Sequence, residues 1–441
     1  MKWGFPGTAD AIFGLTKHGT DVKTEVLAGT VTFMTMAYII VVNPAILVAA
    51  GIPFGPSMVV TILSAIFGTL IMGVYANRPF AIAPYMGENA FVAYTVCGVL
   101  GYSWQTAIGA VFISGILLLI LTVAGGRKLM SEAVPQNLKY SFSVGIGLFI
   151  TFIGLVNTGI VVPANGGGVP VMVGALASPE VMLAIFGFLL MSALLIRKVK
   201  GAILIGMIAT SFLAFVMGIA KAPEAYFSMP PDITPILFQL DITGALSWGF
   251  FAVILTMFTM DFLDTMGGLI GISAQAGFLD ENGNLPEIEK PFLADALATI
   301  FGALAGTSTT GTFMESAAGI QVGGRTGLTA VVVALLFAAA LFFSPVISAI
   351  PAAATGSALI VVGLFMLESV TKIDFSDYSE FIPSFAVIAL MSFTYNIGVG
   401  LCSGFVLYPL FKIIKGEYKE IPPAGWMFFA LCLMFFIFYP Y

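Results

Sequence analysis

Several acidic residues lie within or at the edge of long apolar stretches of the chain. They are Glu25, Glu88, Asp261, Asp264, Asp295 and Glu315. No Lys or Arg lies in the middle of these stretches to pair with them. A carboxylate at the centre of a membrane-spanning helix costs about 2.5–3.5 kcal/mol on insertion scales, so such residues are expected to have a function. Poorly solvated carboxyl groups without a counter-ion could gain and lose protons near neutral pH, which is the chemistry of a proton-coupled carrier.

Asp261 and Asp264 are three residues apart and therefore share nearly one helical face. Two ionised carboxylates at this spacing repel each other, so we expect one to face a cavity and the other to be protonated or bonded to backbone. Asp264 is the better ligand candidate, because Gly267 and Gly268 follow it and glycine permits close approach of another element or of a flat substrate. The alternative is that the pair only holds helices together through hydrogen bonds.

Glu315 lies at the start of the helical part of an irregular segment, AGTSTTGTFMESAAG. Backbone N–H groups of residues 312–316, from Thr312 to Ser316, would offer donors to a ligand there, and Glu315 would offer acceptors. The alternative is that Glu315 only caps the helix.

Four further residues have less specific signals. Asn89 carries donors and acceptors that suit the edge of a heterocycle, or it caps a half-helix. Glu88 faces another direction and is a gate or a packing residue, whereas Asp295 is expected to be a structural hydrogen-bonder near a helix end. Phe80 could stack on a planar ligand. The predicted substrate-binding residues are Phe80, Asn89, Asp264, Thr312, Glu315 and Ser316, and the candidates for a coupling proton are Glu88, Asp261, Asp264 and Glu315.

The elements that must position these residues are membrane-spanning helices. The chain has 441 residues, 59% hydrophobic and 9% charged, and its mean hydropathy is +1.04. A soluble domain has about 45–50% apolar and about 25% charged residues, so this is a polytopic membrane protein. Apolar runs predict fourteen segments at 26–49, 57–76, 80–100, 104–124, 138–157, 179–196, 201–220, 245–271, 291–305, 307–324, 326–346, 353–368, 381–396 and 398–414.

Composition also excludes several classes of function. The net charge of −6, from 17 Lys and Arg against 23 Asp and Glu, gives no basic surface for nucleic acid. Cys97, Cys402 and Cys432 show no disulfide or metal-ligand spacing with the single His18, so no metal and no cofactor are expected. His18 lies in the N-terminal arm, away from the spans, which argues against Ser/His/Asp catalysis and hence against an enzyme.

The distribution of basic residues predicts the orientation. Residues 1–25 lack the features of a signal peptide and are expected to form a cytosolic arm. With the N-terminus in the cytoplasm, every Lys and Arg except Lys221 falls on the cytoplasmic side of the plasma (cell inner) membrane, as the positive-inside rule requires. The apolar tail at 422–441 could cross the membrane again or lie along the bundle.

Two segments, the third and the tenth, are interrupted. The third begins RPFAIAPYMGENAF and the tenth is rich in Gly and Thr, so neither can start as a regular helix. They are seven apart in the order, and Met86–Ala90 resembles Phe313–Ala317. Since seven is odd, the second half would enter the membrane inverted. Inverted repeats with paired broken helices are typical of secondary transporters with a site at mid-membrane.

The sequence resembles the AzgA-like purine permeases, the hypoxanthine, adenine and guanine branch of the nucleobase–cation symporters. The matching stretches are TEVLAGTVTFMTMAYIIVVNPAIL, APYMGENAF, MDFLDTMGGLIGISAQAG, LADALATIFGALAGTSTTGTFMESAAG and GGRTGLTAVVVALLF.

This resemblance implies an all-α fold of fourteen segments in two inverted repeats, with short strands and half-helices in segments three and ten. It also implies a core domain at 26–124 and 221–346 and a gate domain at 125–220 and 347–415, with an arm at 1–25 and a tail at 416–441. Relatives hold a purine between the strands and a carboxylate of segment eight, and proton symport is the usual coupling. Some relatives form gate-domain dimers, so a homodimer is possible here.

Carried over by motif, the family's site residues are Asp264, Glu315 and Asn89. Two positions depart from the commoner family pattern. Tyr85 stands where a Gly is frequent, and Glu88 stands where an apolar residue is frequent. Either could alter which purine fits. The sequence therefore predicts import of adenine, guanine, hypoxanthine or xanthine by proton symport with alternating access. The alternative is an anion carrier or channel on the same fold, with anions at half-helix N-termini. Glu315 argues against it, because its charge would repel an anion.

Overall fold

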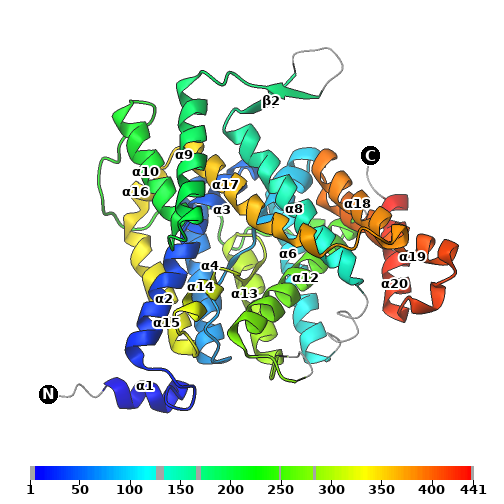
Figure 1. The fold of residues 1–441 in the computed structure, drawn as a ribbon. Coiled ribbons are helices and arrows are strands. Elements are labelled where there is room, and N and C mark those ends of the chain that lie inside the picture. The colour runs from blue at the N-terminus through cyan, green and yellow to red at the C-terminus, as the bar shows by residue number, and fades with distance from the viewer. Residues whose placement is uncertain (1–4, 126–133, 165–169, 248–249, 282–284, 439–441) are drawn as a thin grey trace.

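Two sets of helices surround a pair of short strands in the computed structural model, which describes residues 5–125, 134–164, 170–247, 250–281 and 285–438 (Figure 1). The first half of the spans consists of α2 (Val22–Met36), α3 (Ile39–Leu47), α4 (Phe54–Val74), β1 (Ile82–Pro84), α5 (Met86–Ala90), the π-helical η2 (Phe91–Val99), α6 (Trp104–Val123), α8 (Gln136–Asn157), α9 (Pro179–Ile196) and α10 (Ala202–Val216). The second half consists of α12 (Phe251–Ala276), α13 (Glu289–Ala305), β4 (Thr310–Thr312), α14 (Ser316–Gln321), α15 (Gly327–Ala340), α16 (Ser344–Ser348), α17 (Ala352–Leu367), α18 (Tyr378–Phe393) and α19 (Ile397–Lys415).

The order of these elements confirms the predicted repeat. Each half has two regular spans, then a strand followed by a short helix, then further spans. Within the described ranges, nine helices have the length and composition to cross a membrane, and the segments made of β1 with α5 and of β4 with α14 are interrupted as expected. The fold is therefore the all-α inverted-repeat architecture that the sequence predicted.

The two strands explain how the interruptions are tolerated inside the membrane. β1 and β4 pair antiparallel, with Ile82 opposite Thr312 and Pro84 opposite Thr310. The Thr69 hydroxyl bonds the N–H and C=O of Ile82 at 2.9 and 3.1 Å. The Thr299 hydroxyl bonds the C=O and N–H of Thr310 at 2.9 and 3.1 Å. Lipid offers no hydrogen-bond partner, so these hydroxyls, from α4 and α13, replace a third strand on each edge.

The helices pack in two groups. α2, α4, α6, α13 and α15 pack around the strands, whereas α8, α9, α10, α17, α18 and α19 pack mainly with one another. α12 lies between them and contacts α6, β4, α14 and α19. The predicted division into a core and a gate domain stays a prediction.

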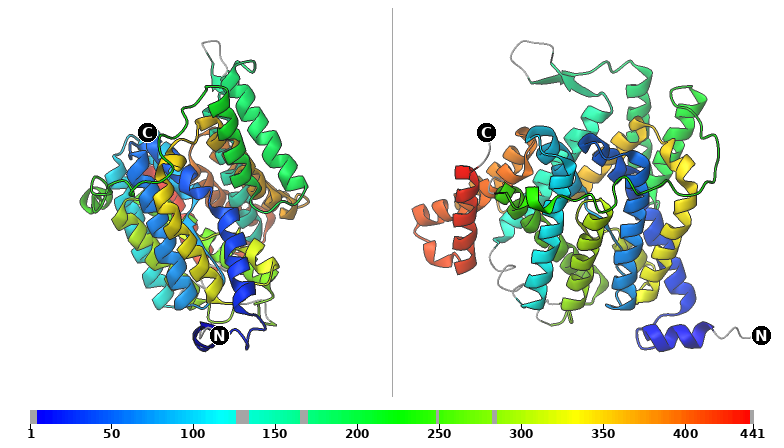
Figure 2. Two further views of the ribbon diagram at one scale, coloured as in Figure 1. Left: turned by 90° about the vertical axis from the view of Figure 1, so that its left-hand side faces the viewer. Right: turned by 180° about the vertical axis from the view of Figure 1, so that it is seen from behind.

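The last helix in the described residues is α20 (Pro423–Phe438), which packs along α19, with the rings of Phe405 and Phe428 stacked at a centroid distance of 4.7 Å. Figure 2 shows α20 at one side of the bundle. The tail therefore packs on the bundle through α19, and whether it crosses the membrane stays an open alternative.

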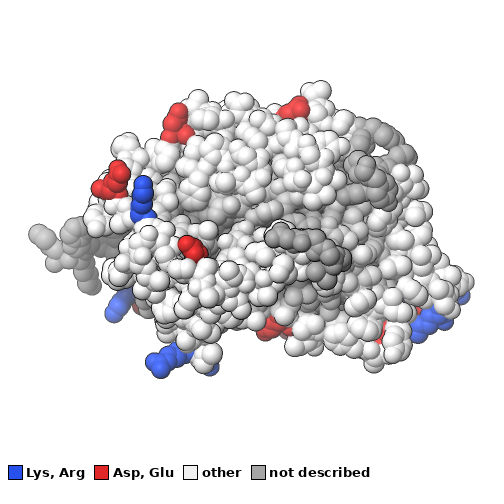
Figure 3. All heavy atoms as spheres, turned by 90° about the horizontal axis from the view of Figure 1, so that it is seen from above, with Lys and Arg blue, Asp and Glu red and all other residues white. Residues whose placement is uncertain are grey.

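A hairpin between α8 and α9 was not expected from the sequence. β2 (Val161–Pro163) and β3 (Val171–Val173) pair antiparallel and project from the face opposite the N-terminal helix α1 (Phe5–Phe13) (Figure 1). An Asn-Gly step between two Val-rich stretches, at 165–166, is a hairpin signal that could have predicted it. Figure 3 looks onto this face, on which Lys and Arg are sparse.

Candidate functional site

The site lies where α12 crosses the strand pair. Gly268 makes this crossing possible, because a Cβ at position 268 would lie only 3.1 Å from the carbonyl oxygen of Thr312. The glycines after Asp264 were expected to admit either another element or a flat substrate. The structure shows that Gly268 admits β4, which brings Asp264 beside both interrupted segments.

Asp264 lies against a second carboxylate. Its side chain meets that of Glu88, which extends from α5. Glu88 is fully buried and neither of its carboxylate oxygens has a hydrogen-bond donor, whereas Asp264 is partly exposed. Among the described residues, neither Glu88 nor Asp264 forms an ion pair with Lys or Arg. Glu88, for which packing was an open alternative, therefore lies in an acidic pair at the site.

Asp261 has different neighbours. It is fully buried and faces the hydroxyls of Ser114 on α6 and Thr299 on α13, although neither carboxylate oxygen closes a hydrogen bond of normal geometry. Asp264 instead faces Glu88. The two aspartates therefore have different neighbours, and which of them points toward a ligand stays a prediction.

Glu315 does not cap its helix. It occupies the N-cap position of α14, but its side chain makes no capping hydrogen bond. Its Oε1 atom instead accepts a hydrogen bond from the hydroxyl of Tyr38, at the break between α2 and α3. Tyr38 was not among the predicted residues, and a tyrosine in an apolar run gave no signal for it.

Asn89 is tied to the protein on one side only. Its amide nitrogen donates to Asn43 Oδ1 at 2.7 Å, and Asn43 donates in turn to Thr61 at 2.7 Å and Thr307 at 3.0 Å. The Oδ1 atom of Asn89 is buried without a donor. Asn89 is therefore not a helix cap, and this carbonyl oxygen remains available as an acceptor.

Three predicted ligand residues use their side chains elsewhere. The Thr312 hydroxyl donates to Asp295 at 3.1 Å, and the Ser316 hydroxyl accepts from the N–H of Ala81 at 3.0 Å. Phe80 is fully buried, with its ring 6.1 Å from that of Phe278 beyond the end of α12. Contact of these three with substrate stays a prediction. Asp295 is a structural hydrogen-bonder as expected, but it lies inside α13 rather than at its end.

A different aromatic pair adjoins the acids. The rings of Tyr85 and Phe313 are parallel within 6° at a centroid distance of 6.4 Å. The Tyr85 hydroxyl lies 3.5 Å from the carbonyl oxygen of Thr312. Position 85, noted above as a departure from the commoner family pattern, thus places a ring beside the strands. No group of three or more His, Cys, Asp or Glu side chains that could hold a metal occurs in the described part of the chain.

Comparison with known proteins places this architecture. Residues 23–419 match the model of the Permease family, Xan_ur_permease. This chain belongs to that family. A guanine/hypoxanthine permease of Bacillus subtilis is 42% identical over 433 residues, covering 97% of this chain and 99% of the relative. An adenine permease of Escherichia coli is 40% identical over 415 residues, covering 94% and 93%. The predicted resemblance to purine permeases is confirmed, and these relatives are transporters rather than enzymes.

Solved structures confirm the fold of this family member. The transmembrane domain of a cyanobacterial bicarbonate transporter aligns with a TM-score of 0.62 at 14% identity, covering 86% of this chain and 96% of that one. The anion transporter SLC26A9 aligns with a TM-score of 0.64 at 9% identity, covering 89% and 66%. At these identities the similarity extends to the inverted-repeat fold alone.

Proposed function

We propose that this permease takes up purine nucleobases by proton symport. The observation that carries the proposal is the proximity of Glu88 and Asp264 where α12 meets both interrupted segments, since neither carboxylate forms an ion pair with a basic side chain in the described part of the chain. The names of the guanine/hypoxanthine and adenine permeases supply the substrate class.

The site offers mainly acceptors to a neutral ring. Asp264, the second oxygen of Glu315 and Oδ1 of Asn89 would accept hydrogen bonds from ring and exocyclic N–H groups. Tyr85 would lie beside the plane of the ring. Phe80, Thr312 and Ser316 would contribute chiefly by holding the strands and α14, since their side chains are engaged there.

The acidic pair gives a reason for proton coupling. Two carboxylates in contact cannot both ionise without strong repulsion, so Glu88 and Asp264 would share one proton. Substrate bound to Asp264 would favour the proton on Glu88, and release of the substrate would allow the proton to move to Asp264. Glu315 and Asp261 are the remaining candidates to carry a coupling proton.

Alternating access would move the two helix groups relative to each other. On the side opposite α1, Thr95 of η2 donates to the carbonyl oxygen of Tyr395 at 3.0 Å, and the Tyr395 ring packs against Tyr94, Phe149 and Phe152. Gly267 and Met314, at the site, are exposed. These contacts support a conformation closed on the far side and open toward the N-terminal face. We place that face in the cytoplasm, as the loop charges require. A homodimer formed through the group of α8, α9, α10, α17, α18 and α19 would leave the other group free to move.

An anion carrier is the less favoured candidate. The similarity to bicarbonate and anion transporters extends to the fold alone. The carboxylates of Glu88, Asp264 and Glu315 would repel an anion from the place where the interrupted segments meet.

Uptake of radiolabelled adenine, hypoxanthine and guanine into proteoliposomes, with and without a protonophore, tests the proposal. We expect accumulation of at least one purine that collapses with the proton gradient, and loss of uptake in Glu315→Gln. Uptake that ignores the gradient would remove the proton from the mechanism. Unchanged affinity in the Gln variant would remove Glu315 from the site.

A further inference from the structure

The short helix α14, which begins after Glu315, packs against α2. Gly319 lets the two helices touch, because a Cβ there would lie 2.6 Å from the carbonyl oxygen of Ala28 and closer still to the Thr32 hydroxyl. The Thr35 hydroxyl lies 3.4 Å from the carbonyl oxygen of Glu315. The short helix that carries Glu315 is therefore packed against α2 at its start and in its middle.

The far end of α14 is clamped as well. Arg325 donates to the carbonyl oxygen of Ile320 at 2.8 Å, which satisfies an acceptor at the end of α14. The buried carboxylate of Glu25, from the start of α2, accepts from the backbone N–H groups of Arg325, Thr326 and Thr329 at 2.9, 3.3 and 3.1 Å. Because α14 is fixed at both ends, the backbone of Glu315 cannot shift. Only its side chain could rotate, unless another residue holds the carboxylate.

We propose that Tyr38 is a positioning residue for purine recognition, which acts by fixing the orientation of the Glu315 carboxylate. The inference rests on the proposed function of this site. The Tyr38 ring is 2% exposed, so water does not compete for its hydroxyl, which donates to Oε1 of Glu315. A hydrogen bond to a carboxylate is among the stronger kinds in proteins.

The bond has a consequence for what the site can recognise. Because Oε1 accepts from Tyr38, Glu315 presents Oε2 to a ligand in a fixed direction, as the oxygen for which no partner is found among the described residues. It would bind a single ring N–H of the purine rather than two. Without the hydroxyl the carboxylate would rotate among several orientations, and substrate binding would have to select one of them.

Tyr38→Phe tests this inference because it removes one oxygen and keeps the ring. We expect the KM for adenine and hypoxanthine uptake to rise about tenfold, with the maximal rate changed less than threefold, since only the orientation of a binding group is lost. Tyr102→Phe is the matched control, because Tyr102 packs edge-on against Phe250 outside the site and should leave KM unchanged.

The double variant separates positioning from packing. If Tyr38 acts through Glu315, Tyr38→Phe should change purine binding in the Glu315→Gln background far less than in the wild type, when measured as binding to the purified protein. An equal loss in both backgrounds, an unchanged KM in the single variant, or a Phe variant that fails to fold would each overturn the inference. A wild-type protein that takes up no purine would instead refute the proposed function. Tyr38→His, which keeps a donor, should recover part of the affinity.

Discussion

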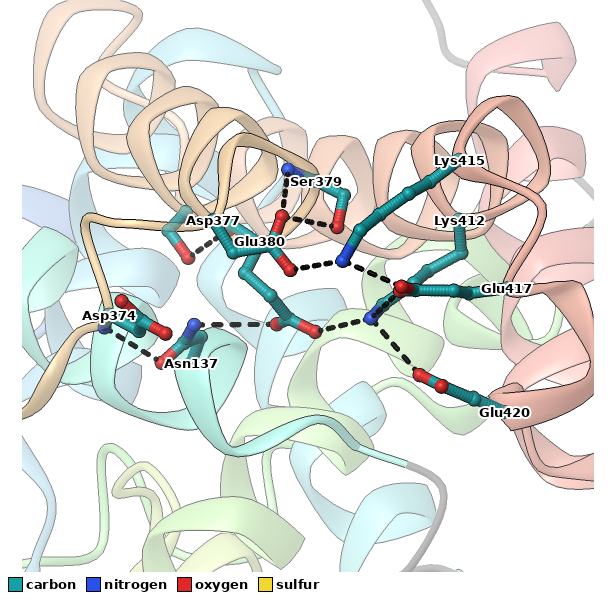
Figure 4. Close-up of polar contacts among 10 residues, drawn as sticks. Asn137, Asp374, Asp377, Ser379, Glu380, Lys412, Lys415, Glu417 and Glu420 are labelled. Carbon is teal, nitrogen blue, oxygen red and sulfur yellow. Dashed lines mark hydrogen bonds and ion pairs between the residues drawn. The ribbon is translucent and has the colours of Figure 1, made fainter.

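Two regions of this permease are rich in carboxylates, and they differ in whether those carboxylates have basic partners. Where the start of α18 meets the end of α19, every acid that surrounds Lys412 and Lys415 has a basic partner (Figure 4). Where α12 meets the interrupted segments, Glu88 and Asp264 lie close to each other, and neither forms an ion pair with Lys or Arg among the described residues.

The Lys cluster joins three helices. The ammonium group of Lys412 is nearly buried and lies 3.1 Å from Glu380, 2.9 Å from Glu417 and 3.3 Å from Glu420. Lys415 lies 2.8 Å from Asp377 and 2.7 Å from Glu417. Asn137 of α8 joins the same network through Glu380 at 3.4 Å (Figure 4).

The presence or absence of a lysine partner indicates which acids have a structural role. A buried carboxylate whose charge is matched by a lysine gains from staying where it is, and removal of the lysine is costly. A carboxylate whose neighbours are hydroxyls or another acid keeps acceptor capacity for a ligand or a proton. Substitution should therefore affect transport at the unmatched acids and stability at the matched ones.

Asp264→Asn should have the largest effect on transport. Loss of the charge removes an acceptor at the site and the partner of Glu88, so we expect purine uptake to fall at least a hundredfold, with a melting temperature close to that of the wild type. Uptake in proteoliposomes and thermal unfolding of the purified protein measure the two effects. Asp232→Asn, at an exposed acid bonded to Thr234, is the control. Near-normal uptake in Asp264→Asn would contradict the assignment of transport to the acids that have no basic partner.

Glu88→Gln should uncouple rather than abolish transport. The glutamine keeps the shape of a protonated Glu88 and leaves Asp264 for the substrate, so equilibrative uptake should persist. Accumulation against a gradient, and its sensitivity to a protonophore, should fall about tenfold because the shared proton is lost. Measurement of purine-induced proton entry with a pH-sensitive dye inside the vesicles would detect this. Full coupling in the variant would assign the proton to another acid.

Lys412→Met should act in the opposite sense, with stability reduced and recognition retained. Removal of the buried ammonium leaves Glu380 without its partner, which costs about 3 kcal/mol when one side of a buried pair is deleted. We expect a lower melting temperature and an unchanged KM in the protein that remains folded. A changed KM with an unchanged melting temperature would show that this cluster, too, belongs to the transport machinery.

The sequence predicted the unmatched acids better than the matched ones, for a physical reason. Charges inside apolar runs are conspicuous, so Asp264 and Glu315 stood out from their neighbours alone. The inverted order of spans and the two interruptions were equally visible, because Pro, Gly and Thr interrupt helices locally.

What the sequence could not predict depends on contacts between distant segments. Tyr38 meets Glu315 across 277 positions, and Asn43 meets Asn89 across 46. Thr312 and Ser316 were assigned to the ligand from their place in the chain, yet their hydroxyls bond Asp295 and Ala81. The direction of a side chain at a strand or a half-helix is set by packing that no local pattern contains.

Asp377→Asn should have the smallest effect, and its pH dependence identifies the cause. Bonds from Lys415, and then from Ser379, lower the pKa of Asp377 to about 2, from the usual 3.8. A carboxyl whose pKa is lowered by folding contributes stability above its unfolded pKa, and this contribution is lost as the pH falls through its folded value. Wild type and variant should therefore differ slightly in melting temperature at pH 6, and the difference should shrink between about pH 4 and pH 2. Because the pair is exposed, 1 M salt should also reduce the difference at pH 6. A difference that shrinks with falling pH but does not change with salt would mean that Asp377 acts through its cap on α18, the bonds from Ser379, rather than through Lys415.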